Sequence, residues 1–320
     1  MWSSKVVETN DPDEFVSLIR PSGCKLLVTG RGEFRGRSTL IDLGGIYAQR
    51  GSERLARVAT VEMTRSGILF HTKPGPSMYW DGAEIRTDQV AIVRAGCGYV
   101  SRLAGPTSWG AMTLSGADME AFCASSSGAR AALLSGCAVV TPPAAALARL
   151  RLLHASAEHL GETSESYAVW LEQALIETMR ELAGFDGGRT DSMARQHHQM
   201  IIRRFMEVLD SQPAGTNYMQ DISDAIGVSS RTLRMACRTQ LGVSPTQYLL
   251  LRRMGLARRA LRQAEPGVTR VTDVATEFGF LELGRFAVKY RQIFGETPSS
   301  TLRAACPPAA GRAAASYAFA

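Results

Sequence analysis

The 320-residue chain lacks any apolar run approaching the ~20 residues that a membrane-spanning helix needs. Its first ten residues contain no apolar stretch behind a basic end, so we expect no secretory signal, no membrane association and a cytoplasmic location. Hydrophobic residues make up 45% of the chain and charged residues 21%, which are values typical of globular proteins. A chain of this length predicts two domains, each with its own core.

Motifs that would indicate a metal or catalytic site are also missing. The six cysteines show no C-x-x-C pairing, which favours reduced thiols over a zinc site and leaves a redox sensor as the weaker alternative. In the N-terminal half, His71 lies alone, and His154 and His159 are spaced wrongly for one helix face. No P-loop, G-x-S-x-G or H-x-E motif is present. We therefore expect no metal, no cofactor, no catalytic residue and no enzyme activity.

Positive charge is concentrated in the C-terminal third. Residues 213–305 contain 13 Lys and Arg against 7 Asp and Glu, whereas the rest of the chain has 23 of each. A localised basic surface suits a polyanion, because displacing counterions from phosphates drives binding. By itself this charge is equally compatible with a solvated basic face.

The N-terminal part is typical of a β-rich domain. Residues 1–20 are polar, and we expect them to be only partly ordered. Asp81-Gly82 predicts a hairpin turn, because both central positions of such a turn need positive φ. Short strands broken by turns, between about 24 and 115, indicate a sandwich or small barrel. The clearest strand segments are 25–29, 40–43, 57–63, 68–72 and 90–94.

Helical periodicity follows over residues 144–160, 165–182 and 194–209. The apolar stripes of the first two helices, which begin at Leu147 and Trp170, either form a dimer interface or pack against the strands. A glycine-rich break lies at 185–189, and residues 212–215 are the expected domain boundary.

A repeat within the last third carries the most specific signal. DISDAIG at 221–227 matches DVATEFG at 273–279, each with a small residue four positions before the glycine. This pattern predicts the first helix and turn of a helix-turn-helix, where glycine permits the left-handed backbone. Downstream matches keep an offset of 53 residues, whereas the glycines are 52 apart, so the second unit has one extra turn residue.

The connector between the two units predicts a stiff helix. Ser244-Pro245-Thr246-Gln247 is a capping box with proline at the first helical position, and Glu265-Pro266-Gly267 ends the helix. Such a helix is roughly 30 Å long. Two recognition helices separated by it could enter successive major-groove segments about 34 Å apart.

These residues resemble the AraC family of transcription regulators. The resemblance is carried by the tandem units, by GVSSRTL at 227–233 and by FGF with GRFAVKYRQIFGETP between 278 and 298. It covers residues 213–305. It implies promoter DNA as a partner, a small-molecule effector in the N-terminal domain, dimer formation and contact with RNA polymerase. An activator is the expected type of regulator, and a repressor is the alternative that these residues leave open.

The resemblance also suggests which residues contact DNA. On the first recognition helix, Arg231, Arg234 and Met235 should reach base edges and Arg238 a phosphate, with Ser230 beside them. On the second recognition helix, Gly284 has no side chain to contact a base, and Val288 offers only an apolar contact. We therefore expect that unit to anchor the DNA backbone. The anchoring residues would be Arg285, Lys289 and Arg291.

Together these patterns predict an α+β protein. Residues 1–190 would form a β-sandwich or cupin-like effector and dimerisation domain with helices, and 191–212 a linker helix. Residues 213–305 would form an all-α domain of two helix-turn-helix units, with a disordered tail at 306–320. Aromatic residues either line an effector pocket or pack in the core: Tyr47, Phe70, Tyr79, Trp80 and Trp109. The alternative functions are a cupin-like enzyme fused to a DNA-binding module and an effector-independent DNA binder.

Overall fold

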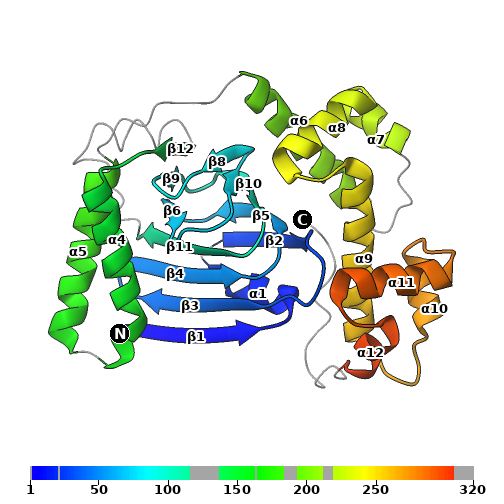
Figure 1. The fold of residues 1–320 in the computed structure, drawn as a ribbon, viewed down its shortest axis with the longest axis horizontal. Helices are drawn as coiled ribbons and strands as arrows, with labels where there is room; N and C mark the ends of the chain where they lie inside the picture. The colour runs from blue at the N-terminus through cyan, green and yellow to red at the C-terminus, as the bar shows by residue number, and fades with distance from the viewer. Residues whose placement is uncertain are drawn as a thin grey trace. The chain divides into compact units, whose positions relative to one another are not determined.

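The computed structural model describes residues 2–20, 22–115, 137–162, 164–183, 193–211 and 219–305. The chain divides into two compact units, the first formed by Met1–Leu26 and Phe34–Asp191, the second by Leu27–Glu33 and Ser192–Ala320. The first unit holds the β-sheets and two long helices, whereas the second is helical (Figure 1). The predicted α+β class is thus confirmed. The expected boundary at 212–215 and the expected disordered tail lie outside the described residues.

Two sheets form the first unit. The seven-stranded sheet has the order β1-β3-β4-β11-β6-β9-β12, and its neighbouring strands are antiparallel. Its strands are β1 (Ser3–Thr9), β3 (Gly36–Asp42), β4 (Ile46–Glu53), β6 (Gly67–His71), β9 (Val90–Val93), β11 (Thr107–Leu114) and β12 (Cys137–Val140). The second sheet comprises, in spatial order, β2 (Ser22–Val28), β5 (Arg57–Met63), β10 (Gly98–Leu103), β7 (Met78–Trp80) and β8 (Ala83–Ile85).

The five predicted strands are confirmed as β2, β3, β5, β6 and β9. The predicted hairpin is also confirmed, because Asp81 and Gly82 join β7 to β8 with φ values of 44° and 74°. The expectation of little order over residues 1–20 is wrong. Strand β1 pairs with β3 along its whole length, and Asp11 caps α1 (Pro12–Leu18). Backbone pairing and a local cap need no apolar side chains, so the polar composition did not reveal them.

A helical layer covers one face of the seven-stranded sheet. It consists of α4 (Ala144–Ser156), the 3-10 helix η1 (Ala157–Glu162) and α5 (Glu165–Ala183) (Figure 1). Leu147, Leu150, Leu171 and Leu175 are buried in one core cluster with Phe70 and other residues of the sheet. Most of the apolar stripes therefore pack against the strands, whereas Trp170, the first residue of the second stripe, is 53% exposed and stays outside this core.

The opposite face of the seven-stranded sheet carries polar groups. Ile46 and Ala48 face the helices, so strand alternation places Tyr47, Gln49, Gly51 and Glu53 of β4 on the other side. Glu53 is 3% exposed and pairs at 3.1 Å with Arg57, which is 5% exposed. Arg57 also donates to Oγ of Ser101 at 2.8 Å. This face therefore meets the five-stranded sheet, since Arg57 and Ser101 belong to β5 and β10.

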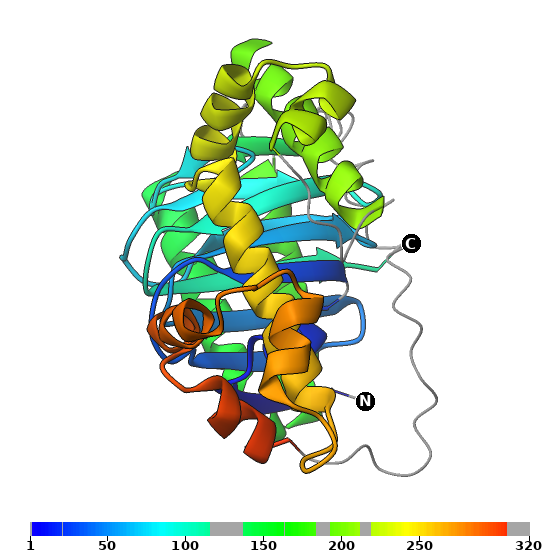
Figure 2. The same cartoon turned by 90° about the vertical axis from the view of Figure 1, so that its right-hand side faces the viewer.

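Seven helices of the second unit are described. They are α6 (Met193–Ser211), α7 (Met219–Ile226), α8 (Ser230–Leu241), α9 (Pro245–Gln263), α10 (Val271–Glu277), α11 (Leu283–Phe294) and α12 (Pro298–Arg303). Helix α9 runs as a rod, with α7 and α8 at its start and α10, α11 and α12 at its end (Figure 2). Helix α6 corresponds to the expected linker helix and packs within this unit, where Phe205 stacks on Tyr248. Across the described residues, every helix is too short or too polar to span a lipid bilayer.

Candidate DNA-binding site

The first helix-turn-helix consists of α7, a turn at Gly227 and α8. Gly227 has φ of 76°, which only glycine adopts without strain, and its N–H donates to the carbonyl of Ser223 at 3.0 Å. Ser223 is the small residue of the repeat and is 1% exposed. The turn then leads into α8, where Ser229 accepts a hydrogen bond from the N–H of Thr232 at 3.1 Å. The predicted unit is confirmed.

Helix α8 separates a buried face from a basic one. Leu233, Ala236 and Cys237 are fully buried. The side chains predicted to contact DNA lie on the opposite, exposed face: Arg231, Arg234, Met235 and Arg238. Within the described part of the chain, no acidic side chain pairs with these three guanidinium groups. The face therefore presents three available cations around Met235, whose side chain is half exposed.

Ser230 stands apart from the other predicted contact residues of α8. Its side chain is half-buried, and its Oγ lies 3.3 Å from Oγ of Ser223 in α7. The structure thus gives Ser230 a hydrogen bond inside the helix-turn-helix rather than a position on the exposed basic face.

The second helix-turn-helix repeats the arrangement with α10, Gly279 and α11. Gly279 has φ of 76°, and its N–H donates to the carbonyl of Thr276 at 2.9 Å. Helix α11 begins four residues after Gly279, whereas α8 begins three residues after Gly227. The extra turn residue predicted from the change in offset is therefore confirmed.

Helix α11 presents a different surface from α8. Gly284, Arg285, Val288 and Arg291 are exposed, and Lys289 is half-buried. No heavy atom outside the local chain lies within 4 Å of a Cβ built on Gly284. Val288 is 60% exposed. Gly284 and Val288 therefore offer no polar side chain at two outward positions, whereas Arg285 and Arg291 are exposed cations.

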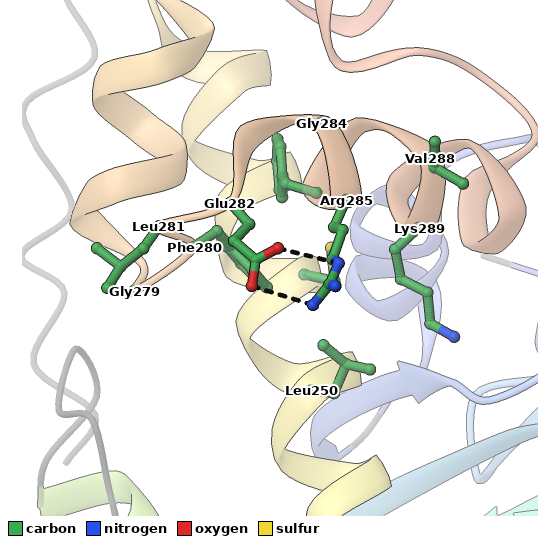
Figure 3. Close-up of a pocket in the computed structure, with 11 residues that line it drawn as sticks. Leu250, Gly279, Phe280, Leu281, Glu282, Gly284, Arg285, Val288 and Lys289 are labelled. Atoms are coloured by element: carbon green, nitrogen blue, oxygen red, sulfur yellow. Dashed lines mark hydrogen bonds and ion pairs between the residues drawn. The ribbon is translucent and has the colours of Figure 1, made fainter.

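Arg285 has a partner that the sequence analysis missed. Its Nε lies 2.9 Å from Oε2 of Glu282, and its Nη1 lies 3.0 Å from Oε1 of the same carboxylate (Figure 3). Both side chains are exposed, at 83% for Arg285 and 65% for Glu282. The sequence did contain a signal for this pair, because Glu282 stands three residues before Arg285 at the start of a helix, and residues at that spacing are neighbours on the helix surface.

An open pocket of about 650 Å³ lies between α9 and α11. Leu250, Met254, Phe280 and Phe286 give it an apolar lining, and Arg285 stands at its edge. Figure 3 shows Leu250 of α9 across the pocket from Arg285 and Lys289 of α11.

The connector helix α9 is held at both ends. Ser244 caps it by accepting from the N–H of Gln247 at 3.2 Å, and Ala264 ends it, as the sequence predicts. Arg252 pairs with Asp210 of α6 at 3.3 Å. Arg258 pairs with Glu296 at 3.1 Å, after the end of α11. Its 19 residues span roughly 28 Å, so the two helix-turn-helix units are joined by a short, anchored rod.

The described thiols and histidines do not form a second site. Burial raises the pKa of the Cys237 thiol to about 12 and that of Cys24 to about 11, which disfavours their reactive thiolate forms. Cys123 and Cys306 lie outside the described residues. Among the residues that are described, no group of three or more His, Cys, Asp or Glu side chains is arranged to hold a metal ion.

Comparison with known proteins places the similarity in this second unit. A family model described as a helix-turn-helix domain matches residues 222–304. The probable thc operon regulatory protein of Rhodococcus erythropolis is 36% identical over 103 residues, which are 32% of this chain and 31% of that protein. The XylDLEGF operon transcriptional activator 2 of Pseudomonas putida is 31% identical over 99 residues, which are 31% of this chain and 63% of that protein. The chain thus covers less than two thirds of either relative.

Solved structures of similar proteins include the AraC-like transcriptional activator CuxR, with 12% identity and a TM-score of 0.46 over 80% of this chain and 95% of that one. A probable AraC family regulator from Rhodopseudomonas palustris is 33% identical over 33% of this chain and 98% of that one, with a TM-score of 0.30. The tandem units on the α9 rod and the operon regulators that match them lead to one conclusion: the C-terminal part of this chain is a helix-turn-helix domain of the AraC type.

Proposed function

We propose that this protein is a sequence-specific transcription regulator that binds double-stranded promoter DNA and responds to a small molecule in its first unit. One observation carries the proposal. Each recognition helix buries one face in its own helix-turn-helix and leaves basic side chains exposed on the other, and α9 joins the two. An exposed basic helix of this kind fits the major groove, where guanidinium groups meet both phosphates and base edges.

The two units divide the work in this proposal. Arg231, Arg234 and Met235 of α8 read base edges, and Arg238 contacts a phosphate. In α11, Lys289 and Arg291 contact phosphates, and Val288 contacts a thymine methyl group. Support comes from the exposure of these side chains, of which only Lys289 is half-buried, and from the absence of ion pairs to Arg231, Arg234 and Arg238 within the described residues.

The test compares Arg234→Ala with Lys289→Ala in the full-length protein. Duplexes selected by the wild type from a randomised library are titrated with each variant, alongside a duplex of unrelated sequence. Arg234→Ala should lower the preference at one base pair by about 1–3 kcal/mol. Lys289→Ala should weaken all duplexes alike and reduce the salt slope by about one unit. Equal losses across all sequences for both variants would contradict the division of roles.

The effector part of the proposal is supported by the polar face between the two sheets of the first unit. Tyr47 Oη, His71 Nδ1 and Trp80 Nε1, on strands of the two sheets, are each buried without a hydrogen-bond partner among the described residues. Trp109 also faces this space and donates to Glu53 at 2.9 Å. Phe70 lies instead in the core beneath the helices, and Tyr79 stacks under Arg102. Buried groups with unused donors and acceptors suit a small ligand that carries hydrogen-bonding groups.

A metabolite screen tests this part. Thermal unfolding of the wild type, followed by tryptophan fluorescence, should shift upward with the effector and stay unchanged with unrelated compounds. The effector should also change the affinity for the selected duplex. A compound that stabilises the protein without altering DNA binding would support a binding pocket but not regulation.

We further expect a homodimer, contact with RNA polymerase in activation, and a cytoplasmic location.

A further inference from the structure

The strongest unexplained feature is the ion pair between Glu282 and Arg285 on the recognition helix of the second unit. An exposed ion pair of this spacing contributes little to stability, about 0.3–0.5 kcal/mol. A carboxylate on a surface that meets phosphates would also oppose DNA binding by charge repulsion. Glu282 is also the N-cap residue of α11, but it makes no side-chain capping hydrogen bond, so its charge adds only the helix-dipole contribution of about 0.3–1 kcal/mol. Folding therefore gives a small reason for Glu282 to stand there, and general attraction to DNA gives a reason against it.

The geometry of the pair leaves Arg285 able to read a base. A guanidinium group has five N–H donors, of which Nη1 gives one to Glu282 at 3.0 Å, while Nε lies 2.9 Å from the other carboxylate oxygen as an ion-pair contact. Three donors remain, and a guanine needs two of them, one for O6 and one for N7. One hydrogen bond and one ionic contact from the same carboxylate restrict the orientation of the guanidinium group before the DNA arrives, which lowers the entropy lost on binding.

The charge of the pair also distinguishes Arg285 from the cations of the first unit. Glu282 neutralises Arg285, which weakens its attraction to phosphate but leaves its directional donors. Among the described residues, Arg231, Arg234 and Arg238 have no such partner. Beside Arg285, Gly284 leaves open space within 4 Å, so a base edge can approach the helix there.

We propose that Glu282 is a positioning residue that holds Arg285 for two-bond recognition of a guanine in the major groove. The second unit then reads a guanine through hydrogen bonds, in addition to the backbone contacts and the apolar contact of Val288 proposed above. This inference rests on the proposed function, because it requires α11 to meet duplex DNA.

The test uses full-length protein and compares Glu282→Gln with Arg285→Ala. Duplexes are selected from a randomised library, and the affinity for single-base variants is then measured at several salt concentrations. Glu282→Gln should weaken the preference for one guanine at least fivefold. The freed Arg285 should strengthen binding to unrelated duplex and steepen the salt slope by about 0.9. Arg285→Ala should lose the preference at the same position without steepening the slope.

Glu277→Gln is the matched control, because Glu277 is exposed in α10, outside the pair, and its substitution changes the net charge equally. It should leave the guanine preference unchanged, and thermal unfolding should show that all variants fold.

The inference is overturned if Glu282→Gln keeps the guanine preference and salt slope of the wild type. It is also overturned if Glu282→Gln alters a cytosine position that Arg285→Ala does not, since Glu282 would then read the base itself. Wild-type protein that binds no duplex would refute the proposed function as well.

Discussion

At the scale of single residues, His154 shows how burial controls a titratable group. Its ring is fully buried and packs edge-on against Phe70 at 5.1 Å between centroids. Burial, together with the nearby Arg50 guanidinium, lowers the pKa of His154 to about 4. The folded first unit therefore holds a neutral imidazole under conditions in which an exposed histidine would already be protonated.

This lowered pKa predicts acid sensitivity in a defined range. As pH falls below about 6.5, the unfolded chain takes up a proton at His154 before the folded chain does. The contribution of His154 to the free energy of unfolding is therefore fully present above that pH. It decreases by about 3 kcal/mol as the pH falls to 4. In His154→Leu, the free energy of unfolding should fall less over the same range.

Urea unfolding followed by tryptophan fluorescence measures this effect. All four tryptophans, Trp2, Trp80, Trp109 and Trp170, belong to the first unit, so the signal reports on that unit alone. Identical pH dependence in the wild type and in His154→Leu would show that His154 is protonated without cost in the fold.

At the scale of elements, α9 determines how the two recognition helices can be used together. Ion pairs anchor α9 through Arg252 to α6 and through Arg258 to Glu296. The length of α9 therefore sets the distance between the two helix-turn-helix units and their relative rotation. Each residue of an α-helix adds 1.5 Å and a turn of about 100°. A change of one residue therefore alters the direction in which α11 points relative to α8.

We predict that insertion of one alanine after Leu249 lowers the affinity for a selected duplex at least tenfold, about 1.4 kcal/mol, because only one helix can then enter its groove. Fluorescence anisotropy with labelled duplex measures the loss. Thr246→Ala lies in the same helix, preserves its length and should bind normally. Normal binding by the insertion variant, with unchanged helix content by circular dichroism, would show that the two units bind DNA independently.

At the scale of the whole molecule, the helical layer of the first unit leaves apolar side chains on its outer surface. Leu152 of α4 is 68% exposed, and on α5 Val169 is 39% and Trp170 53% exposed. Large apolar side chains exposed on neighbouring helices are candidates for a contact surface with another protein. Leu171 and Leu175 of α5 are used in the core, whereas Trp170 of the same stripe remains available for a dimer.

We therefore predict that the protein is a homodimer that uses α5 and that Trp170→Glu shifts it to the monomer. Sedimentation velocity at several concentrations measures this shift. Gln173→Glu adds the same charge at another exposed position of α5 and should remain dimeric. A wild type that sediments as a monomer at all concentrations would contradict the prediction.

The sequence by itself determined the local features of the DNA-binding unit. The left-handed glycines, the Ser244 cap, the length of α9 and the extra turn residue all follow from backbone preferences that act over a few residues. The alternation of exposed and buried positions on α8 also follows from helical spacing. Each of these was predictable because its physical cause lies within one turn or one helix of the chain.

Only the tertiary structure decided the features that depend on distant parts of the chain. The pairing of β1 with β3, the burial of Glu53 with Arg57 and the neutral state of His154 each require segments brought together by folding. The strands β4, β10 and β11 were missed because their glycines and charged residues are accommodated by cross-strand partners, such as Trp109 beside Gly51. The engagement of both Glu282 oxygens by Arg285 likewise depended on side-chain geometry, which residue spacing permits but does not determine.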